Sequence, residues 1–210
     1  MKLYAFTVAP NPTKVRLYLA EKAAAGNEIR LTELMVNVAQ GEQRLPEHLT
    51  RNPLGRLPVL ELDDGSFLTE SLAIIEYLED LWPEPPMIGV DPRSRARTRE
   101  LERIAEFGVL QPVARIIHAT NSPLGLPPMP EVAEHYRRAL PGPLGVLDAV
   151  LADGRPFVAG ERPSIADCTL QAAFQFARFR KLEIDPVFEH VARWDRAYRD
   201  RGPAKAVLVF

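Results

Sequence analysis

The sequence predicts a small α/β domain over residues 1–82, followed by an all-helical domain over residues 93–210. Strand and helix patterns alternate in the first part. The second part shows helical periodicity, and only its last residues resemble a strand. Between the two lies PEPPMIGVDP, residues 83–92, which is proline-rich and aperiodic and is therefore predicted to be a linker.

The composition is that of an ordinary globular protein. The 26 basic and 28 acidic residues nearly cancel, so no global field draws the chain to nucleic acid or to an anionic membrane. The single cysteine, Cys168, cannot form an internal disulfide and lies in a predicted buried helix. We find no signal peptide, no apolar run of membrane-spanning length and no metal-ligand spacing, and we expect a cytoplasmic protein that binds no metal.

The N-terminal elements begin with a strand over Lys2–Thr7. A helix is expected over about Pro12–Ala25, because Asn11 is a good N-cap and Pro12 suits the first helical position. A second strand lies within Glu28–Val38, and the connection rules make it parallel to the first.

The stretch NPLGRLPVLELDDGSFLTES, residues 52–71, predicts a hairpin and the start of a helix. Its strands are Pro58–Leu62 and Ser66–Thr69, joined by the turn Asp-Asp-Gly. Glu70 or Ser71 then begins a helix that Pro83 ends. The order of the domain is therefore βαβ followed by ββα.

The helical part is expected to contain at least three long segments. A helix over residues 93–120 should be kinked by Pro112, and Pro141-Gly142-Pro143 interrupts the segment 131–152. In PSIAD, Ser164 is the expected N-cap and Asp167 completes a capping box for a helix to about Phe179. The last helix is expected over roughly 186–198.

Three segments in this order resemble the cytosolic glutathione S-transferase superfamily. They are APNPTKVRLYLAEK, NPLGRLPVLELDDGSFLTES and PSIADC, and the first is similar to the S-P-N-x-x-K-V-R opening of bacterial theta- and nu-like members. The resemblance covers essentially the whole chain. It implies a thioredoxin-like glutathione-binding domain over residues 1–82, an all-α C-terminal domain and a homodimer.

The resemblance also implies which residues bind glutathione. A cis Leu57-Pro58 bond would turn the backbone N–H and C=O of Leu57 outward to pair with the cysteine of the tripeptide. Ser71 at a helix N-terminus would receive the γ-glutamyl carboxylate, and Glu70 would attract the neighbouring amino group. The matching positions for the glycine carboxylate are Gln43 and Arg56.

Activation of the thiol is the open chemical question. A free thiol has a pKa near 8.5, so ionising it at pH 7 requires roughly two pKa units, or about 2.7 kcal/mol. A helix N-terminus typically supplies about 0.3 to 1 kcal/mol. The family's activating hydroxyl precedes the proline, but here that residue is Ala9, and Pro10 and Pro12 lack N–H donors.

The remaining groups of this turn are Asn11, Thr7, Thr13 and Lys14. Asn11 is the first candidate for activating the sulfur, because its amide can donate while the helix adds its dipole; the alternative is a plain N-cap. Thr7 is the second candidate.

The pocket for the electrophile is expected to be mostly apolar. Its predicted residues are Phe6, Ala9, Pro10, Ile104, Phe107, Gln111 and His118. His118 either lines this pocket or is a structural histidine.

Taken together, these expectations predict a glutathione transferase. Its thiolate would add to a carbon of a hydrophobic electrophile or displace a leaving group there. Two alternatives stay open. One is a glutathione-dependent disulfide reductase or peroxidase on the same scaffold. The other is a non-catalytic, dimeric glutathione-binding carrier or interaction protein, in which Ala9 marks lost chemistry.

Overall fold

The computed structural model describes all residues, 1–210, and its N-terminal part contains a four-stranded mixed sheet. The strand order is β2-β1-β3-β4, with bounds β1 Lys2–Ala5, β2 Thr32–Met35, β3 Val59–Glu61 and β4 Phe67–Thr69. β1 and β2 are parallel, and β3 is antiparallel to both β1 and β4. The predicted βαβ and ββα units and the thioredoxin-like fold are thus confirmed.

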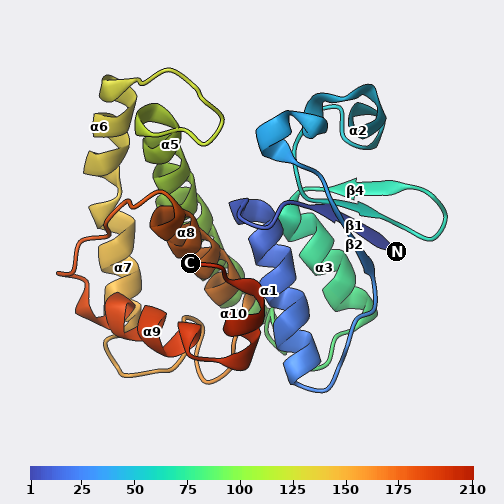
Figure 1. Cartoon of the computed structure of the whole chain (residues 1–210). Coiled ribbons are helices and arrows are strands. Elements are labelled where there is room, and N and C mark those ends of the chain that lie inside the picture. The colour runs from blue at the N-terminus through green and yellow to red at the C-terminus, as the bar shows by residue number, and fades with distance from the viewer.

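The two faces of this sheet are covered unequally. Alternate residues of β1 point to opposite faces, so Leu3 and Ala5 join the main core while Tyr4 joins a small cluster with Val59. The main core lies against α1 (Pro10–Ala24) and α3 (Ser71–Leu81), which lie side by side in Figure 1. The connection between β2 and β3 contains the short helices η1 (Val38–Gln40), η2 (Glu42–Arg44) and α2 (Pro46–Arg51).

The start of α1 differs from the prediction. The helix begins at Pro10, two residues early, and Ala9 occupies the N-cap with extended backbone angles. Pro10 takes the first helical position, where its missing N–H costs nothing. Asn11 is therefore inside the first turn, and the interpretation of Asn11 as the N-cap is wrong.

The second part of the chain is entirely helical, as predicted, and Figure 1 shows it beside the sheet domain. Its central helix α8 (Ile165–Phe179) is buried along most of its length and contacts α1 as well as helices of its own domain. Its remaining elements are α4 (Pro92–Arg103), η3 (Ile104–Leu110), α5 (Gln111–Thr120), α6 (Pro130–Ala139), α7 (Pro141–Leu151), α9 (Glu189–Arg199) and α10 (Gly202–Val207). None of the helices is both long and apolar enough to cross a bilayer.

The helix over residues 92–120 is continuous, but its middle segment, η3, is a π-helix. Pro112 follows this segment, and because it has no N–H it cannot complete the ordinary helical bond to the carbonyl of Gly108. The predicted disturbance at Pro112 thus takes the form of a wider turn before the proline. A side chain at Gly108 would clash with Pro143 of α7, since an added Cβ would lie 2.4 Å from the Cβ of that proline.

Other helical predictions can also be compared with the structure. The break at Pro141 is confirmed, because α6 and α7 are separate helices that meet at Leu140. The last long helix begins at Glu189, three residues later than expected. The strand-like pattern of the final residues was misleading, because Gly202–Val207 form α10, with Pro203 in its first turn.

The capping box of α8 is confirmed and ties two helices together. The buried carboxylate of Asp167 accepts hydrogen bonds from the N–H and hydroxyl of Ser164 at 2.9 and 2.7 Å. It also accepts from the N–H of Val158 at 2.8 Å and from the indole N–H of Trp194 on α9 at 2.9 Å. The start of α8 is therefore fixed to the preceding loop and to α9.

Candidate active site

A cleft of about 690 Å³ separates the sheet domain from the α4–η3–α5 helix. Its N-terminal wall comes from the starts of α1 and α3 and from the turn before β3. Its helical wall comes from one side of α4, η3 and α5. Eight predicted residues line this one cleft, and they are Pro10, Asn11, Arg56, Glu70, Ser71, Phe107, Gln111 and His118.

The start of α3 presents free donors to the cleft. The first intrahelical bond here is made by Ile74, whose N–H donates to the carbonyl of Glu70 at 3.0 Å. The N–H groups of Ser71 and Leu72 and the hydroxyl of Ser71 have no partner within the chain. Glu70 has a φ of 66°, an uncommon conformation for a residue with a side chain. The free N–H groups and the hydroxyl can together donate to an anion at the start of α3, and the exposed carboxylate of Glu70 lies beside them.

The turn before β3 is held by two buried side chains. Nε2 of His48 and Nδ2 of Asn52 both lie 3.0 Å from the carbonyl oxygen of Arg56. The next peptide bond, Leu57-Pro58, is cis, and the N–H and C=O of Leu57 make no hydrogen bond within the chain. The backbone of Leu57 is therefore available to pair with an extended peptide.

The two residues expected at the glycine end of glutathione are placed differently. The guanidinium of Arg56 is exposed, lines the cleft and makes no ion pair. Gln43 is buried outside the cleft lining, and its Oε1 atom has no hydrogen-bond partner. Leu57 and Pro58 are also buried and do not line the cleft with their side chains.

The first turn of α1 leaves one residue free to donate toward the cleft. The hydroxyl of Thr13 is committed, because it donates to the carbonyl of Ala9 at 3.0 Å and accepts from Gln175 at 2.9 Å. Lys14 is buried and pairs with Glu106 of η3, which compensates its charge. Asn11 lines the cleft, and neither its amide nor its N–H has a partner within the chain.

A smaller apolar cavity of about 390 Å³ adjoins the cleft. Phe6, Ala9, Val38 and Phe179 line it, and it shares Pro10, His118 and Phe176 with the cleft. Besides Gln43, Leu57 and Pro58, two further predicted residues lie in neither space. Thr7 lines neither cavity, and Ile104 packs against the main core.

His118 stands where the two cavities meet. Its Nδ1 lies 3.0 Å from the hydroxyl of Ser122. Burial lowers the pKa of His118, and the positive charges of Arg115 and Arg180 lower it further. Both effects disfavour the protonated imidazole.

Sequence reasoning named three charged residues of the cleft and missed three others, which are Arg103, Glu106 and Arg115. Arg115 follows Gln111 by four residues and precedes His118 by three, so helical spacing alone places it on the same face. Arg103 also lines the cleft, but it pairs with the buried Glu102. No local signal reveals the Lys14–Glu106 pair, whose partners are 92 positions apart.

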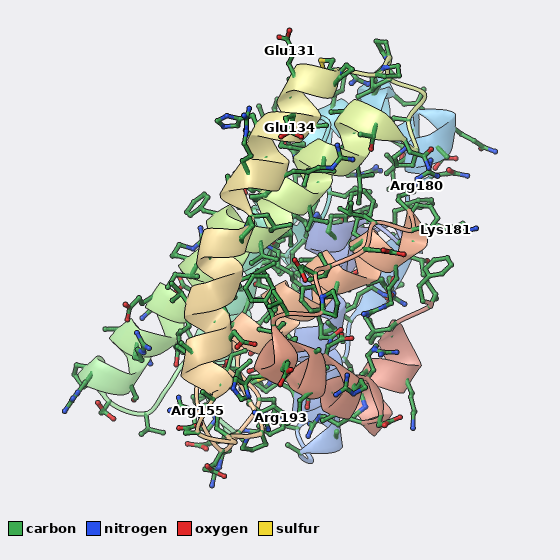
Figure 2. All side chains as sticks on the ribbon, turned by 90° about the vertical axis from the view of Figure 1, so that its left-hand side faces the viewer. Glu131, Glu134, Arg155, Arg180, Lys181 and Arg193 are labelled. Carbon is green, nitrogen blue, oxygen red and sulfur yellow. The ribbon has the colours of Figure 1, made fainter.

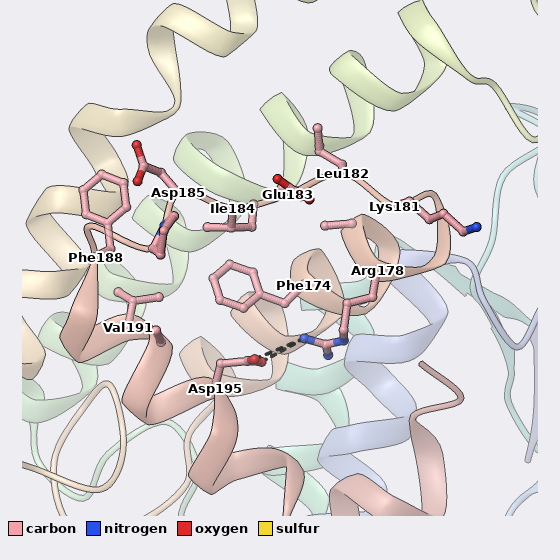
Figure 3. A pocket seen from close by; sticks show the side chains of 13 residues that line it. Phe174, Arg178, Lys181, Leu182, Glu183, Ile184, Asp185, Phe188, Val191 and Asp195 are labelled. Atoms are coloured by element: carbon pink, nitrogen blue, oxygen red, sulfur yellow. Dashed lines mark hydrogen bonds and ion pairs between the residues drawn. The ribbon is translucent and has the colours of Figure 1, made fainter.

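A separate cavity of about 620 Å³ lies between the end of α8 and α9 and contains none of the predicted residues. Figure 3 shows Phe174, Ile184 and Val191 around it and the Arg178 side chain directed at Asp195. That ion pair has an N···O distance of 3.0 Å. Cys168 is also remote from the cleft, and burial raises the pKa of its thiol, so the thiol is unreactive.

The mixed sheet, the cis-proline turn beside two helix starts and the helical domain across the cleft define a thioredoxin-like domain joined to an all-α domain. Family models describe both parts: residues 3–86 match the glutathione S-transferase N-terminal domain, and residues 130–197 match the C-terminal domain.

Individual relatives agree with these matches. The chain is 33% identical to glutathione S-transferase 2 of Saccharomyces cerevisiae, over 99% of this chain and 89% of that protein. It is 42% identical to a maleylacetoacetate isomerase of Pseudomonas aeruginosa, over 47% of this chain and 45% of that protein. A crystal structure of a glutathione S-transferase domain-containing protein from Marinobacter aquaeolei is 32% identical, with a TM-score of 0.87, over 97% of this chain and 100% of that one. The protein therefore belongs to the glutathione S-transferase family.

Proposed function

We propose that this protein binds glutathione in the cleft and transfers its thiolate to an electrophilic carbon held in the adjoining apolar cavity. One observation carries the proposal: Ser71 at the start of α3, Asn11 at the start of α1 and Arg56 all line a single cleft and make no hydrogen bond or ion pair through their side chains within the chain. The proposed functional units are the glutathione-binding domain, residues 1–82, and the helical domain, residues 93–210. We further propose that the protein is a cytoplasmic homodimer acting in detoxification.

The proposed orientation follows the charges along the N-terminal wall. The γ-glutamyl carboxylate would accept hydrogen bonds from the free N–H groups of α3 and from Ser71, where the helix dipole favours an anion. Glu70 would attract the amino group beside it. Leu57 would pair with the cysteine backbone, and Arg56 would meet the glycine carboxylate, assisted by Gln43 if its side chain turns toward the ligand.

Activation of the sulfur would then depend on Asn11. A hydrogen bond to a charged group is worth about 1.5 to 3 kcal/mol, comparable to the roughly 2.7 kcal/mol that full ionisation at pH 7 requires. The positive end of α1 adds to this effect, whereas Lys14 does not, because Glu106 neutralises it. The thiolate then forms a C–S bond while a leaving group departs with its electron pair, or a proton adds to the neighbouring carbon.

The test is a titration of the protein–glutathione complex, followed by thiolate absorbance in the ultraviolet between about pH 5 and 9. We expect the bound thiol to ionise below its free pKa of about 8.5, and Asn11→Ala to remove at least half of that shift. Gln40→Ala is the matched control, since Gln40 is exposed and its side chain makes no hydrogen bond. Absence of glutathione binding would overturn the proposal.

The same measurements separate the alternatives. Binding with an unshifted thiol pKa would favour the non-catalytic carrier. A shifted pKa with turnover of a mixed disulfide or a peroxide, but not of an aryl halide, would favour the reductase or peroxidase. The transferase is expected to consume an aryl halide and release halide in equal amount.

A further inference from the structure

The positive charges around His118 are not compensated by the protein itself. Arg115 lines the cleft, Arg180 lines the apolar cavity, and His118 lines both. Neither arginine is within ion-pair distance of a carboxylate. Arg180 is held by the backbone carbonyl of Asn121 at 2.8 Å and by that residue's side-chain oxygen, both of which are neutral.

Two other arginines of the helical domain that line cavities are paired. Arg103 in the same cleft is bound by Glu102, and Arg178 in the cavity of Figure 3 is bound by Asp195. Figure 2 shows Arg180 next to Lys181, far from Arg155 and Arg193 at the opposite end of the helical domain. Arg115 and Arg180 are thus unpaired charges of the helical domain in the two cavities that share His118, whereas the unpaired Arg56 belongs to the N-terminal wall.

Both guanidinium groups belong to cavities that His118 lines. The positive charges of Arg115 and Arg180 also lower the pKa of His118, after the larger effect of burial. Arg115 is presented by the face of α5 that also carries Gln111, and Arg180 lies just after the end of α8. Two separate elements therefore each contribute one arginine to the adjoining cavities.

We propose that the electrophile is amphipathic, with an apolar body in the cavity lined by Phe6, Ala9 and Phe179 and a carboxylate bound by Arg115 and Arg180. This inference rests on the proposed function and narrows its substrate class. Arginine presents several N–H donors in a plane and suits a carboxylate. Arg180 is partly buried and Arg115 is exposed, so an anion bound between them would be reached from the open side of the cleft. An electrophile without an anionic group would leave both charges uncompensated.

The test compares two glutathione conjugates that differ only at the end of the S-substituent. S-(carboxypropyl)glutathione ends in a carboxylate, and S-butylglutathione ends in a methyl group. Isothermal titration should give tighter binding of the carboxylated conjugate by about tenfold or more, the value of one charge-assisted hydrogen bond.

Variants then assign the preference to residues. Arg115→Gln should reduce the ratio of the two affinities about tenfold and leave the affinity for S-butylglutathione unchanged; Arg180→Gln should act in the same direction. Arg137→Gln is the matched control, because Arg137 is an exposed arginine on α6 without an ion pair and outside both cavities. It should change neither affinity.

The outcomes distinguish this inference from the function on which it rests. Equal binding of the two conjugates by the wild type, or an unchanged ratio in both Arg115→Gln and Arg180→Gln, overturns the inference while the function stands. If neither conjugate nor glutathione binds, both fail together. Preferred turnover of a carboxylated aryl chloride over chlorodinitrobenzene, abolished by Arg115→Gln, gives an independent kinetic confirmation.

Discussion

The two walls of the cleft present different kinds of chemical groups. The N-terminal wall offers backbone donors and acceptors at turns and helix starts, near Leu57, Ser71 and Asn11. The helical wall offers side chains spaced along one face of a helix, including Gln111, Arg115 and His118. A wall of backbone groups suits a ligand whose structure does not vary. On a wall of side chains, by contrast, amino-acid substitutions can change which ligand is bound without altering the fold.

The walls are joined by a buried ion pair, and breaking it should have the largest effect. Lys14→Met leaves Glu106 without its partner between α1 and η3, and loss of one partner of a buried pair costs about 3 to 5 kcal/mol. Urea unfolding should show this loss of stability. The double variant Lys14→Met/Glu106→Met should recover most of it, because no unpaired charge remains. A loss below about 1 kcal/mol in Lys14→Met would show that the pair does not join the walls energetically.

The N-terminal wall was predictable because its signals are local. The hairpin turn, the start of α3 and the sequence NPLGR all follow from neighbouring residues whose conformations are restricted. The error at Asn11 has the same origin. This good capping residue lies directly between Pro10 and Pro12, and Pro10 rather than Pro12 takes the first helical position.

The helical wall was predicted less completely because it depends on contacts between distant segments. Helical spacing correctly groups Phe107 with Gln111 and His118, but Ile104 turns to the core within the π-helix, whose altered phase no simple period predicts. The pairing state of each charge decides whether it is available in the cleft. That state depends on partners such as Glu106 for Lys14, which the sequence does not identify.

The helical wall should also depend on the cap of the helix behind it. The Asp167 carboxylate accepts four hydrogen bonds, and Asp167→Asn replaces one of its two acceptor oxygens by an NH₂ group. At least one of the buried N–H or O–H donors therefore loses its partner. We expect a loss of about 3 kcal/mol in the free energy of unfolding, since the bonds to a buried carboxylate are strong. Thermal unfolding measures it, and Asp148→Asn is a less buried comparison whose carboxylate accepts from two N–H groups of α9. Equal losses of unfolding free energy in the two variants would contradict the larger stabilisation that we expect from the buried Asp167.

The N-terminal wall can be weakened separately through Asn52. Asn52→Ala removes the hydrogen bonds to the Arg56 carbonyl and from the Leu54 N–H, at a cost of about 1 to 2 kcal/mol. Glutathione affinity should fall several-fold because the Leu57 backbone is less firmly held. Asn27→Ala is the matched control, as it also removes a bond to a backbone carbonyl, that of Glu84, outside the cleft. If both variants bind glutathione equally well, Asn52 contributes only to folding.

The smallest expected effect concerns pH and the helical wall alone. Burial and the charges of Arg115 and Arg180 lower the pKa of His118 in the free protein. A bound carboxylate would offset those charges and raise this pKa, so binding takes up a proton and affinity increases as pH is lowered. The other charged groups lining the cleft are Glu70, the paired Lys14 and Glu106, and the arginines Arg56, Arg103 and Arg115. The affinity for S-(carboxypropyl)glutathione should therefore rise a few-fold as pH is lowered from about 7.5 to about 5.5, while that for S-butylglutathione shows little change. His118→Gln should abolish the rise. If the affinity still rises at low pH in His118→Gln, another group takes up the proton. If the affinities for both conjugates rise equally, that group belongs to the N-terminal wall.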